Sequence, residues 1–159
     1  MAQANTHRVD LPYSAEAAPF LSTTVREPRR GAILVLEDRD DVRQGMAQLL
    51  DLHGFLVVDA ATAEEALVHL GTDPQGFALI LLDLMMPGRL NGSDFRARQL
   101  ASQDLAHIPT LVVSATCPDS AARAELHPDA WIEKPFRFDD LLAIVKYYVT
   151  PEAGAMIVD

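Results

Sequence analysis

Two short runs of this sequence, Ala32–Leu36 and Ala78–Leu82, are apolar at every position. A strand that is apolar on both faces has to be covered on both faces, which is typical of the central strands of a parallel sheet flanked by helices. Between and after these runs, apolar residues recur at helical spacing. The pattern therefore predicts an α/β fold in which helices cover both faces of a doubly wound parallel sheet.

Along the chain, the predicted strands and helices alternate as five strand–helix pairs. We expect strands at 32–36, 55–60, 78–82, 110–114 and 130–133. The first helix should end before Gly54, and Thr62 and Glu65 form a capping box for the second, which Gly71 ends. Ser93 is expected to cap the third helix, and the last two are expected at 119–126 and 138–149. Such a sheet has five parallel strands in a flavodoxin-like (βα)5 arrangement.

The length of 159 residues suits one domain with tails. Residues 1–30 contain three prolines and no sustained period of 2 or 3.6, so we expect a mobile N-terminal arm. The domain is predicted over 31–150, followed by a short tail at 151–159. These boundaries predict a single domain with no attached output domain.

Net charge, the length of the apolar runs and the cysteine count limit the possible functions and locations of the protein. The net charge of −10 argues against non-specific binding to nucleic acid, whose affinity comes mainly from Lys and Arg. No apolar run approaches the roughly 20 residues that span a bilayer, and the first residues do not resemble a secretion signal, so we expect a cytoplasmic protein that does not bind membranes. Cys117 is the only cysteine, which excludes an internal disulfide and leaves oxygen ligands for any metal.

Polar side chains follow four of the predicted strands at their carboxyl ends, where the functional crevice of a doubly wound sheet lies. They are Glu37 and Asp38 after the first strand, Asp83 after the third, Ser114 at the end of the fourth and Lys134 after the fifth. Carboxylates that lie close together repel one another, and a hard divalent cation relieves that repulsion. The sequence therefore predicts a site for Mg²⁺ and a phosphoryl group.

In this site Asp38 and Asp83 are expected to hold Mg²⁺ directly, with Glu37 reaching the ion through water. Phosphoryl transfer needs neutralisation of the equatorial oxygens, which Lys134, the Ser114 hydroxyl and the Ala115 backbone amide can supply together with the ion. Asp83 is then the nucleophile that accepts the phosphoryl group.

Four segments resemble the receiver domain of bacterial two-component response regulators, in particular the stand-alone chemotaxis-type regulators. These segments are Ile33–Asp38, Leu79–Pro87 followed by Gly92, Val112–Ala115 and Glu133–Phe136. The resemblance implies a phosphoprotein of a two-component system that catalyses only its own phosphorylation and dephosphorylation. Its implied partners are a histidine kinase or a histidine phosphotransfer protein, and an unidentified target protein.

The resemblance also implies individual roles. Asp83 receives the phosphoryl group, Glu37 and Asp38 are the acidic pair, and the Met85 carbonyl binds the metal. Ser114 and Lys134 contact the phosphoryl oxygens, and Ser114 and Trp131 form the switch. Met85 and Thr116 flank the path of the water that hydrolyses the phosphoaspartate, so they set the rate of dephosphorylation.

Two departures from the family pattern affect the structure. The loop from Pro87 to Gly92 has one residue more than usual, which displaces the start of the third helix. The segment between Ser114 and Trp131 is shorter than usual and contains Pro118 and Pro128, so only about two helical turns are expected there.

Other functions are compatible with parts of the pattern. An aspartate-nucleophile phosphatase needs a second acidic residue at the position of Met85, and a flavodoxin-like mononucleotide binder needs a phosphate loop where Glu37 and Asp38 stand. A phosphorylation-independent scaffold has no need of the intact site. Within the switch function, a phosphorelay intermediate and a direct regulator of a target protein both remain open.

Overall fold

A computed structural model describes residues 9–10, 28–116 and 119–151 of the protein. Cys117, most of the expected N-terminal arm and the expected tail beyond Pro151 lie outside the described residues. Within the described ranges no helix is long and apolar enough to cross a membrane.

One sheet organises the molecule, with the strand order β1-β6-β5-β4-β2-β3. Its five parallel strands are β2 (Ala32–Leu36), β3 (Val57–Ala60), β4 (Phe77–Asp83), β5 (Thr110–Ser114) and β6 (Ala130–Glu133). They confirm the predicted doubly wound fold. The sheet has in addition an antiparallel edge strand, β1 (Val9–Asp10), which pairs with β6 and which the sequence did not predict.

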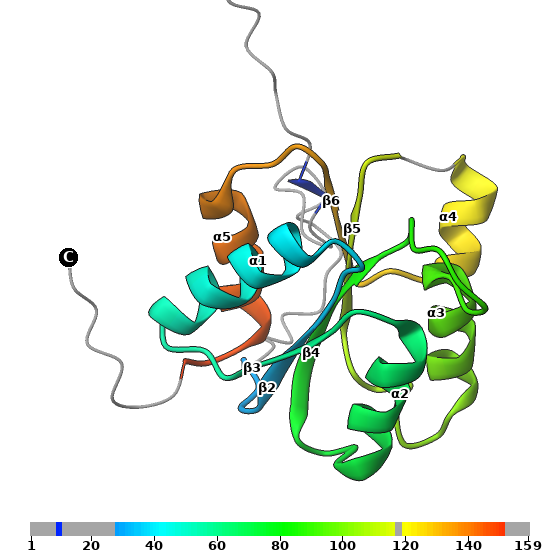
Figure 1. The fold of residues 1–159 in the computed structure, drawn as a ribbon, viewed down its shortest axis with the longest axis horizontal. Helices are drawn as coiled ribbons and strands as arrows, with labels where there is room; N and C mark the ends of the chain where they lie inside the picture. Colours follow the sequence, from blue (N-terminus) through cyan, green and yellow to red (C-terminus); the bar gives the residue numbers. More distant parts are fainter. Residues whose placement is uncertain (1–8, 11–27, 117–118, 152–159) are drawn as a thin grey trace, which may run out of the picture.

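In the described part of the chain, five helices cover the two faces of the sheet. They are α1 (Asp40–Leu52), α2 (Ala63–Thr72), α3 (Gly92–Ala101), α4 (Ser120–Leu126) and α5 (Phe138–Tyr148). Figure 1 shows α1 and α5 on one face and α2, α3 and α4 on the other. The short α4 has the roughly two turns expected from the flanking prolines.

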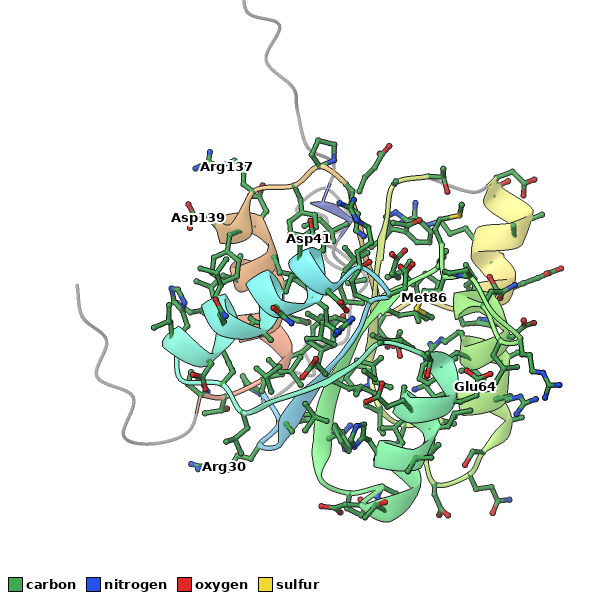
Figure 2. All side chains as sticks on the ribbon, viewed as in Figure 1. Arg30, Asp41, Glu64, Met86, Arg137 and Asp139 are labelled. Atoms are coloured by element: carbon green, nitrogen blue, oxygen red, sulfur yellow. The ribbon has the colours of Figure 1, made fainter. Side chains whose placement is uncertain are left out.

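The core explains why the central strands are apolar throughout. Every residue of β4 is buried, and from Leu79 to Leu82 its side chains alternate between two hydrophobic clusters. Leu79 and Leu81 pack in the cluster with α1 and α5, whereas Ile80 and Leu82 pack in the cluster with α2 and α3. Met86 is buried as well, while charged residues such as Asp41 and Glu64 lie at the periphery (Figure 2). Both faces of the strand are therefore excluded from water, as predicted.

Helix ends test the predicted caps. The Thr62 side chain accepts a hydrogen bond from the Glu65 backbone N–H at 3.1 Å, so Thr62 caps α2 as predicted. The other half of the expected capping box differs, because the Glu65 carboxylate accepts from the Ala61 N–H at 2.9 Å and not from Thr62. Gly54 has a φ of 85° directly after the end of α1, in the left-handed region that favours glycine. Gly71, expected to end α2, lies inside that helix, which continues to Thr72.

The start of α3 differs from the prediction. Asn91, not Ser93, is the N-cap: its side chain accepts from the Asp94 N–H at 2.9 Å, and the Asp94 side chain accepts from the Asn91 N–H at 3.2 Å. This reciprocal pair satisfies two backbone donors at once, whereas Ser93 is exposed in the first helical turn.

The chain enters the domain beside the end of α5. The Arg29 N–H donates to the Tyr148 carbonyl at 2.8 Å, and the Thr150 N–H donates to the Arg29 carbonyl at 2.9 Å. Arg29 therefore forms a parallel bridge with Val149 just before β2 begins.

Candidate functional site

Three carboxylates meet at the carboxyl ends of β2 and β4. Glu37 and Asp38 come directly after β2, and Asp83 is the last residue of β4. Each offers one carboxylate oxygen, and these three oxygens all lie within 4.8 Å of one another. Glu37 is fully buried and Asp83 is 5% exposed, while Asp38 is half-buried. The structure thus brings together the acidic residues that the sequence predicted as a cluster.

Lys134 reaches this cluster from the end of β6. Its ammonium group donates to Glu37 Oε2 at 2.6 Å and to Asp83 Oδ2 at 3.1 Å. The Lys134–Pro135 peptide bond is cis. The remaining oxygens of the two carboxylates accept from backbone: Glu37 Oε1 from Arg39 N–H at 3.1 Å, and Asp83 Oδ1 from Met85 N–H at 2.9 Å.

The electrostatics of the cluster favour a further cation. Burial raises the pKa of Glu37, an effect that its hydrogen bonds from Lys134 and Arg39 reduce and that the charge of Asp83 reinforces. Burial alone would lower the pKa of Lys134, but the hydrogen bond to Glu37 and the charge of Asp83 outweigh it and raise that pKa. One ammonium group thus faces three carboxylates, and oxygen donors with excess negative charge suit Mg²⁺.

Arg43 supports the cluster from α1, a role that the sequence did not indicate. Its buried guanidinium donates to the Glu37 backbone carbonyl at 3.0 Å, and it also binds the side chains of Asp59 at 2.9 Å and Asp40 at 2.6 Å. The hydrogen bond that Arg43 donates to Asp40 is the main reason why the pKa of Arg43 is raised despite burial. Arg43 therefore fixes the turn that carries Glu37. An arginine on an amphipathic helix is expected in solvent, so its spacing gave no signal.

Gly92 supports the cluster from the other side. A Cβ at this position would collide with the carbonyl oxygen of Asp83 and would lie 2.6 Å from the Cα of Leu84, both backbone atoms. The first residue of α3 therefore packs directly against the end of the strand that carries Asp83. The sequence marked Gly92 as part of a family motif but did not reveal this contact.

Ser114 ends β5, the neighbour of β4, and is fully buried. Its backbone carbonyl accepts from the Lys134 N–H at 2.9 Å, which ties the two predicted phosphoryl-binding residues together. Its hydroxyl oxygen accepts from the Thr116 N–H at 3.4 Å. Ala115 and Thr116 are exposed, as is Met85, at 63%. Ala115, Thr116 and Met85 therefore lie in accessible loops around the cluster, whereas the Ser114 side chain is buried at the end of its strand.

Trp131, the predicted switch aromatic, lies inside the molecule. Its side chain is 2% exposed and packs with Val112, Leu126 and Leu84, the residue that follows Asp83. The Arg123 guanidinium lies over its ring, 5.1 Å from the centroid. Within the described residues the indole N–H has no hydrogen-bond acceptor. Leu84 packs against this cluster, so the cluster that holds Trp131 borders the loop after the acceptor strand.

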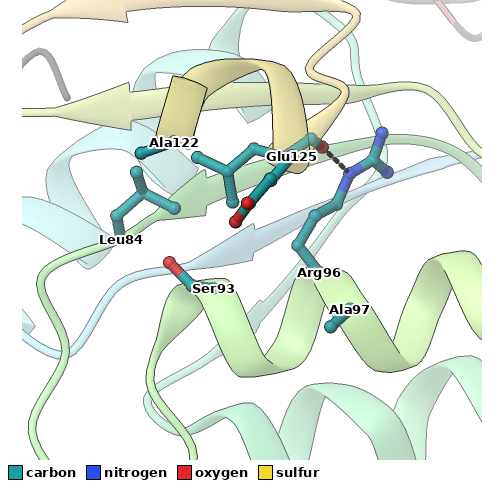
Figure 3. A pocket seen from close by; sticks show the side chains of 7 residues that line it. Leu84, Ser93, Arg96, Ala97, Ala122 and Glu125 are labelled. Atoms are coloured by element: carbon teal, nitrogen blue, oxygen red, sulfur yellow. Dashed lines mark hydrogen bonds between the residues drawn. The ribbon is translucent and has the colours of Figure 1, made fainter. Parts of the chain in front are cut away.

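A cavity of about 230 Å³ opens between α3 and α4 (Figure 3). It is lined by Leu84, Ser93, Arg96, Ala97, Ala122, Glu125 and Leu126. The Arg96 side chain at its base donates from Nε to the Leu126 carbonyl at 2.9 Å, the bond that is dashed in the figure. The acidic residues of the site do not line this cavity.

Comparison with known proteins decides the family. The family model of the response regulator receiver domain matches residues 33–146. The chain belongs to this family. Receiver domains are in general signal transducers and not metabolic enzymes, and they bind Mg²⁺ in an acidic pocket. The resemblance stated from the four motif segments is thereby confirmed.

The curated relatives are longer proteins. The chain is 33% identical over 128 residues to the response regulator MprA of Mycolicibacterium vanbaalenii, which covers 77% of this chain and 53% of the relative. It is 36% identical over 120 residues to the alkaline phosphatase synthesis transcriptional regulatory protein SphR of Synechococcus elongatus. This match covers 70% of this chain and 46% of SphR. The chain therefore spans about half the length of the curated relatives that it matches.

Solved structures give the same fold. A response regulator receiver protein from Pseudomonas putida matches with a TM-score of 0.67 and 26% identity, over 76% of this chain and 98% of that one. The chemotaxis protein CheY4 of Vibrio cholerae matches with a TM-score of 0.68 and 22% identity, over 76% and 100%. This match covers the whole CheY4 chain.

Proposed function

We propose that this receiver domain accepts a phosphoryl group on Asp83 in a Mg²⁺-dependent reaction and thereby switches a protein-interaction surface. The observation that carries the proposal is the position of Asp83: a buried carboxylate at a strand end, within 4.8 Å of Glu37 and Asp38 oxygens and 3.1 Å from the Lys134 ammonium. Buried like charges at such an edge are costly unless the site is used to bind cations and phosphate.

The residues that would hold Mg²⁺ are Asp38 and Asp83, with Glu37 through water and the Met85 backbone carbonyl as a further ligand. Their hard oxygen donors fit this ion, which favours one or two carboxylates together with phosphate oxygens. When bound, the ion would neutralise charge on the phosphoryl group. Because the Met85 N–H already binds Asp83 Oδ1, the loop that carries the carbonyl is fixed next to the acceptor.

The chain's own groups then position the transfer. The Asp83 carboxylate attacks phosphorus as the bond to the donor's imidazole nitrogen breaks, so the phosphoryl group moves and the imidazole leaves. Lys134, the Ser114 hydroxyl and the Ala115 amide are proposed to bind the equatorial oxygens. Lys134 is held for this role by its two carboxylate partners, 2.6 and 3.1 Å away.

The proposed donor is a histidine kinase or a histidine phosphotransfer protein, and the proposed output is a contact with a target protein, switched through Ser114 and Trp131. The net charge of −10 favours a protein partner over nucleic acid for this chain. Some longer relatives are named transcriptional regulatory proteins, and the chain spans only about half of them. A phosphorelay intermediate is the second candidate, because the same site can return its phosphoryl group to a histidine.

An aspartate-nucleophile phosphatase is less well supported. Two residues after the nucleophile such an enzyme needs an acid, and here the position holds Met85, whose side chain is apolar and 63% exposed.

Intact-protein mass spectrometry with acetyl phosphate and Mg²⁺ tests the proposal. The wild type and Asp51→Asn, which changes an exposed carboxylate at the end of α1, should both gain a phosphoryl adduct. Asp83→Asn should gain none, because an amide does not act as the nucleophile. An undiminished adduct on Asp83→Asn would remove Asp83 from the acceptor role.

A further inference from the structure

The peptide group between Glu37 and Asp38 is held from outside the acidic cluster. Its carbonyl oxygen accepts a hydrogen bond from Arg43 Nη1 at 3.0 Å, inside the protein. This carbonyl and the Asp38 N–H belong to one planar peptide unit, so a bond that fixes the oxygen also fixes the plane to which the Asp38 Cα is attached. Arg43 therefore acts on the backbone of Asp38 as well as on that of Glu37.

Asp38 depends on its backbone for its orientation. Among the described residues, neither a hydrogen bond nor an ion pair holds the Asp38 carboxylate. The Glu37 carboxylate, in contrast, is bound by Lys134 at 2.6 Å and by the Arg39 N–H at 3.1 Å, and both oxygens of Asp83 accept hydrogen bonds. Of the three carboxylates, Asp38 is the one whose direction is set by the main chain and not by hydrogen-bond partners.

The Arg43 guanidinium spans the turn that carries Asp38. Nη1 binds the start of the turn at the Glu37 carbonyl, and Nη2 donates to Asp40 Oδ1 at 2.6 Å, where α1 begins. Nε donates to Asp59 Oδ2 at 2.9 Å on β3. Three acceptors around one buried side chain suit the planar fork of a guanidinium, whereas a lysine ammonium is a single point on a flexible stem. The position therefore requires arginine and not merely a positive charge.

We propose that Arg43 is a positioning residue for the Mg²⁺ site: by holding the peptide between Glu37 and Asp38, it aims the Asp38 carboxylate at the point where the three acidic oxygens converge and so sets the affinity of the site for Mg²⁺. Groups that orient metal ligands without touching the metal commonly change its affinity by tenfold or more. The inference rests on the proposed function, in which Asp38 and Asp83 bind the ion directly.

The charge of Arg43 opposes this role, which makes the two effects separable. A positive charge beside an acidic cluster repels a cation, so loss of the charge alone would strengthen the binding of Mg²⁺. Loss of the positioning would weaken it. Arg43→Lys keeps the charge and removes the fork, whereas Arg43→Met removes both. Weaker binding in either variant therefore reports the geometry of the site and not its charge.

Titration of the folded chain with MgCl₂, followed by the amide chemical shifts in NMR spectra, measures the dissociation constant separately from stability. We expect Arg43→Lys to bind Mg²⁺ roughly tenfold more weakly than the wild type, and Arg43→Met to bind it more weakly as well. With acetyl phosphate, Arg43→Lys should need correspondingly more Mg²⁺ for its half-maximal phosphorylation rate. At saturating Mg²⁺ it should reach the wild-type rate, because the groups that react are unchanged.

Arg96→Lys is the matched control. Arg96 is also a buried arginine that donates to a main-chain carbonyl, at Leu126, so the same substitution removes a comparable set of bonds. Its partners lie on α3, β5 and the end of α4 and not in the acidic cluster, so its Mg²⁺ dissociation constant should stay within about twofold of the wild-type value. An equal loss of affinity in Arg96→Lys would mean that any destabilising change weakens the site, and it would overturn the inference.

Two further outcomes separate this inference from the proposed function. A wild type whose spectrum does not respond to Mg²⁺ would overturn the metal site itself, and the positioning role with it. A wild type that binds Mg²⁺, together with an unchanged dissociation constant in Arg43→Lys or tighter binding in Arg43→Met, would overturn the positioning role alone.

Discussion

The ammonium group of Lys134 lies closer to Glu37 than to the acceptor: 2.6 Å from Glu37 Oε2 against 3.1 Å from Asp83 Oδ2. Glu37 is fully buried, and among the described residues its carboxylate receives its only other hydrogen bond from the Arg39 N–H. Lys134 therefore serves two purposes in this structure. It neutralises a buried carboxylate that lies behind the acceptor, and it stands within reach of a group bound to Asp83.

Lys134→Met should destabilise the protein by roughly 1–3 kcal/mol, because Glu37 and Asp83 lose a charged donor and remain buried. Mg²⁺ should raise the melting temperature of this variant by more than that of the wild type, because without the lysine more repulsion between the carboxylates is left for the ion to relieve. Thermal unfolding with and without Mg²⁺ measures both effects. Lys146→Met, which changes an exposed lysine on α5, is the control and should match the wild type. If Mg²⁺ raised the melting temperature of Lys134→Met by no more than that of Lys146→Met, the proposed link between Lys134 and the carboxylate repulsion would be contradicted.

Removal of Mg²⁺ should lower the melting temperature of the wild type. The three carboxylate oxygens within 4.8 Å repel one another, so an ion that binds only the folded site stabilises it by mass action. Titration of millimolar Mg²⁺ in a thermal scan should raise the melting temperature, and Asp38→Ala should reduce the rise. The metal site is disproved if the wild type shows no rise, or if Asp38→Ala rises as much.

Gly92→Ala should disturb the acceptor from outside the cluster. The added Cβ meets the Asp83 carbonyl oxygen and the Leu84 Cα, and backbone atoms cannot rotate away as a flexible side chain can. We expect a loss of about 1–3 kcal/mol of stability and a lower yield of phosphoryl adduct. Thermal unfolding and the acetyl phosphate assay measure the two effects.

Gly71→Ala is the matched control for this change. Gly71 lies within α2, and apart from the backbone of its own helix no atom of the described residues lies within 4 Å of the Cβ that alanine would add. Alanine there should stabilise the protein by about 0.5–1 kcal/mol, because glycine is the weaker helix former, and should leave the adduct yield unchanged. If the two variants behaved alike, the contact of Gly92 with Asp83 would have no bearing on the site.

A second buried arginine ties α3 to the end of α4. Arg96 is 3% exposed and donates to the Leu126 carbonyl at 2.9 Å, the Gln99 side chain at 2.7 Å and the Thr110 hydroxyl at 2.8 Å. Burial lowers the pKa of Arg96, an effect that the nearby Asp129 carboxylate opposes. The network therefore links three elements next to the cavity between α3 and α4.

Arg96→Met should destabilise the protein by about 2–4 kcal/mol, because Gln99, Thr110 and the α4 carbonyls lose their donor inside the protein. Arg98→Met, an exposed position two residues along the same helix, should change stability by less than about 0.5 kcal/mol. Chemical unfolding in urea measures both. A loss in Arg96→Met no larger than in the control would mean that the network contributes no net stability.

The five parallel strands could be predicted because burial on both faces leaves an unbroken apolar run, as in β4. The cap of α3 could not: Asn91 and Ser93 are both good N-cap residues, and only the reciprocal bonds with Asp94 select between them. The strand β1 was missed because two residues show no period.

The site was predictable only in its outline. Strand ends brought Glu37, Asp83 and Lys134 to one edge, and the structure places them in contact. Which carboxylate Lys134 binds more closely depends on side-chain geometry that spacing does not contain. The supporting roles of Arg43 and Arg96 were missed, since charged residues on helices are normally exposed and their burial becomes favourable only when tertiary partners surround them.

The lifetime of the phosphorylated state should depend on two exposed side chains beside the acceptor. Hydrolysis needs a water in line with the bond between phosphorus and Asp83, and Met85 and Thr116 are the positions expected to flank its path. Met85 is 63% exposed and apolar, so it has no group that orients a water, and the Thr116 hydroxyl is short. We therefore expect a phosphoaspartate that persists longer than in the fast chemotaxis-type regulators.

Met85→Asn and Thr116→Glu should each shorten this lifetime several-fold, equivalent to about 1 kcal/mol of barrier, because an amide or carboxylate can hold the attacking water. Loss of the phosphoryl adduct over time, followed by mass spectrometry after removal of acetyl phosphate, measures the rate. Met85→Leu is the control: it keeps an apolar side chain and should leave the rate unchanged. If the wild type loses its adduct within seconds, or the double variant is no faster, another group controls the attacking water.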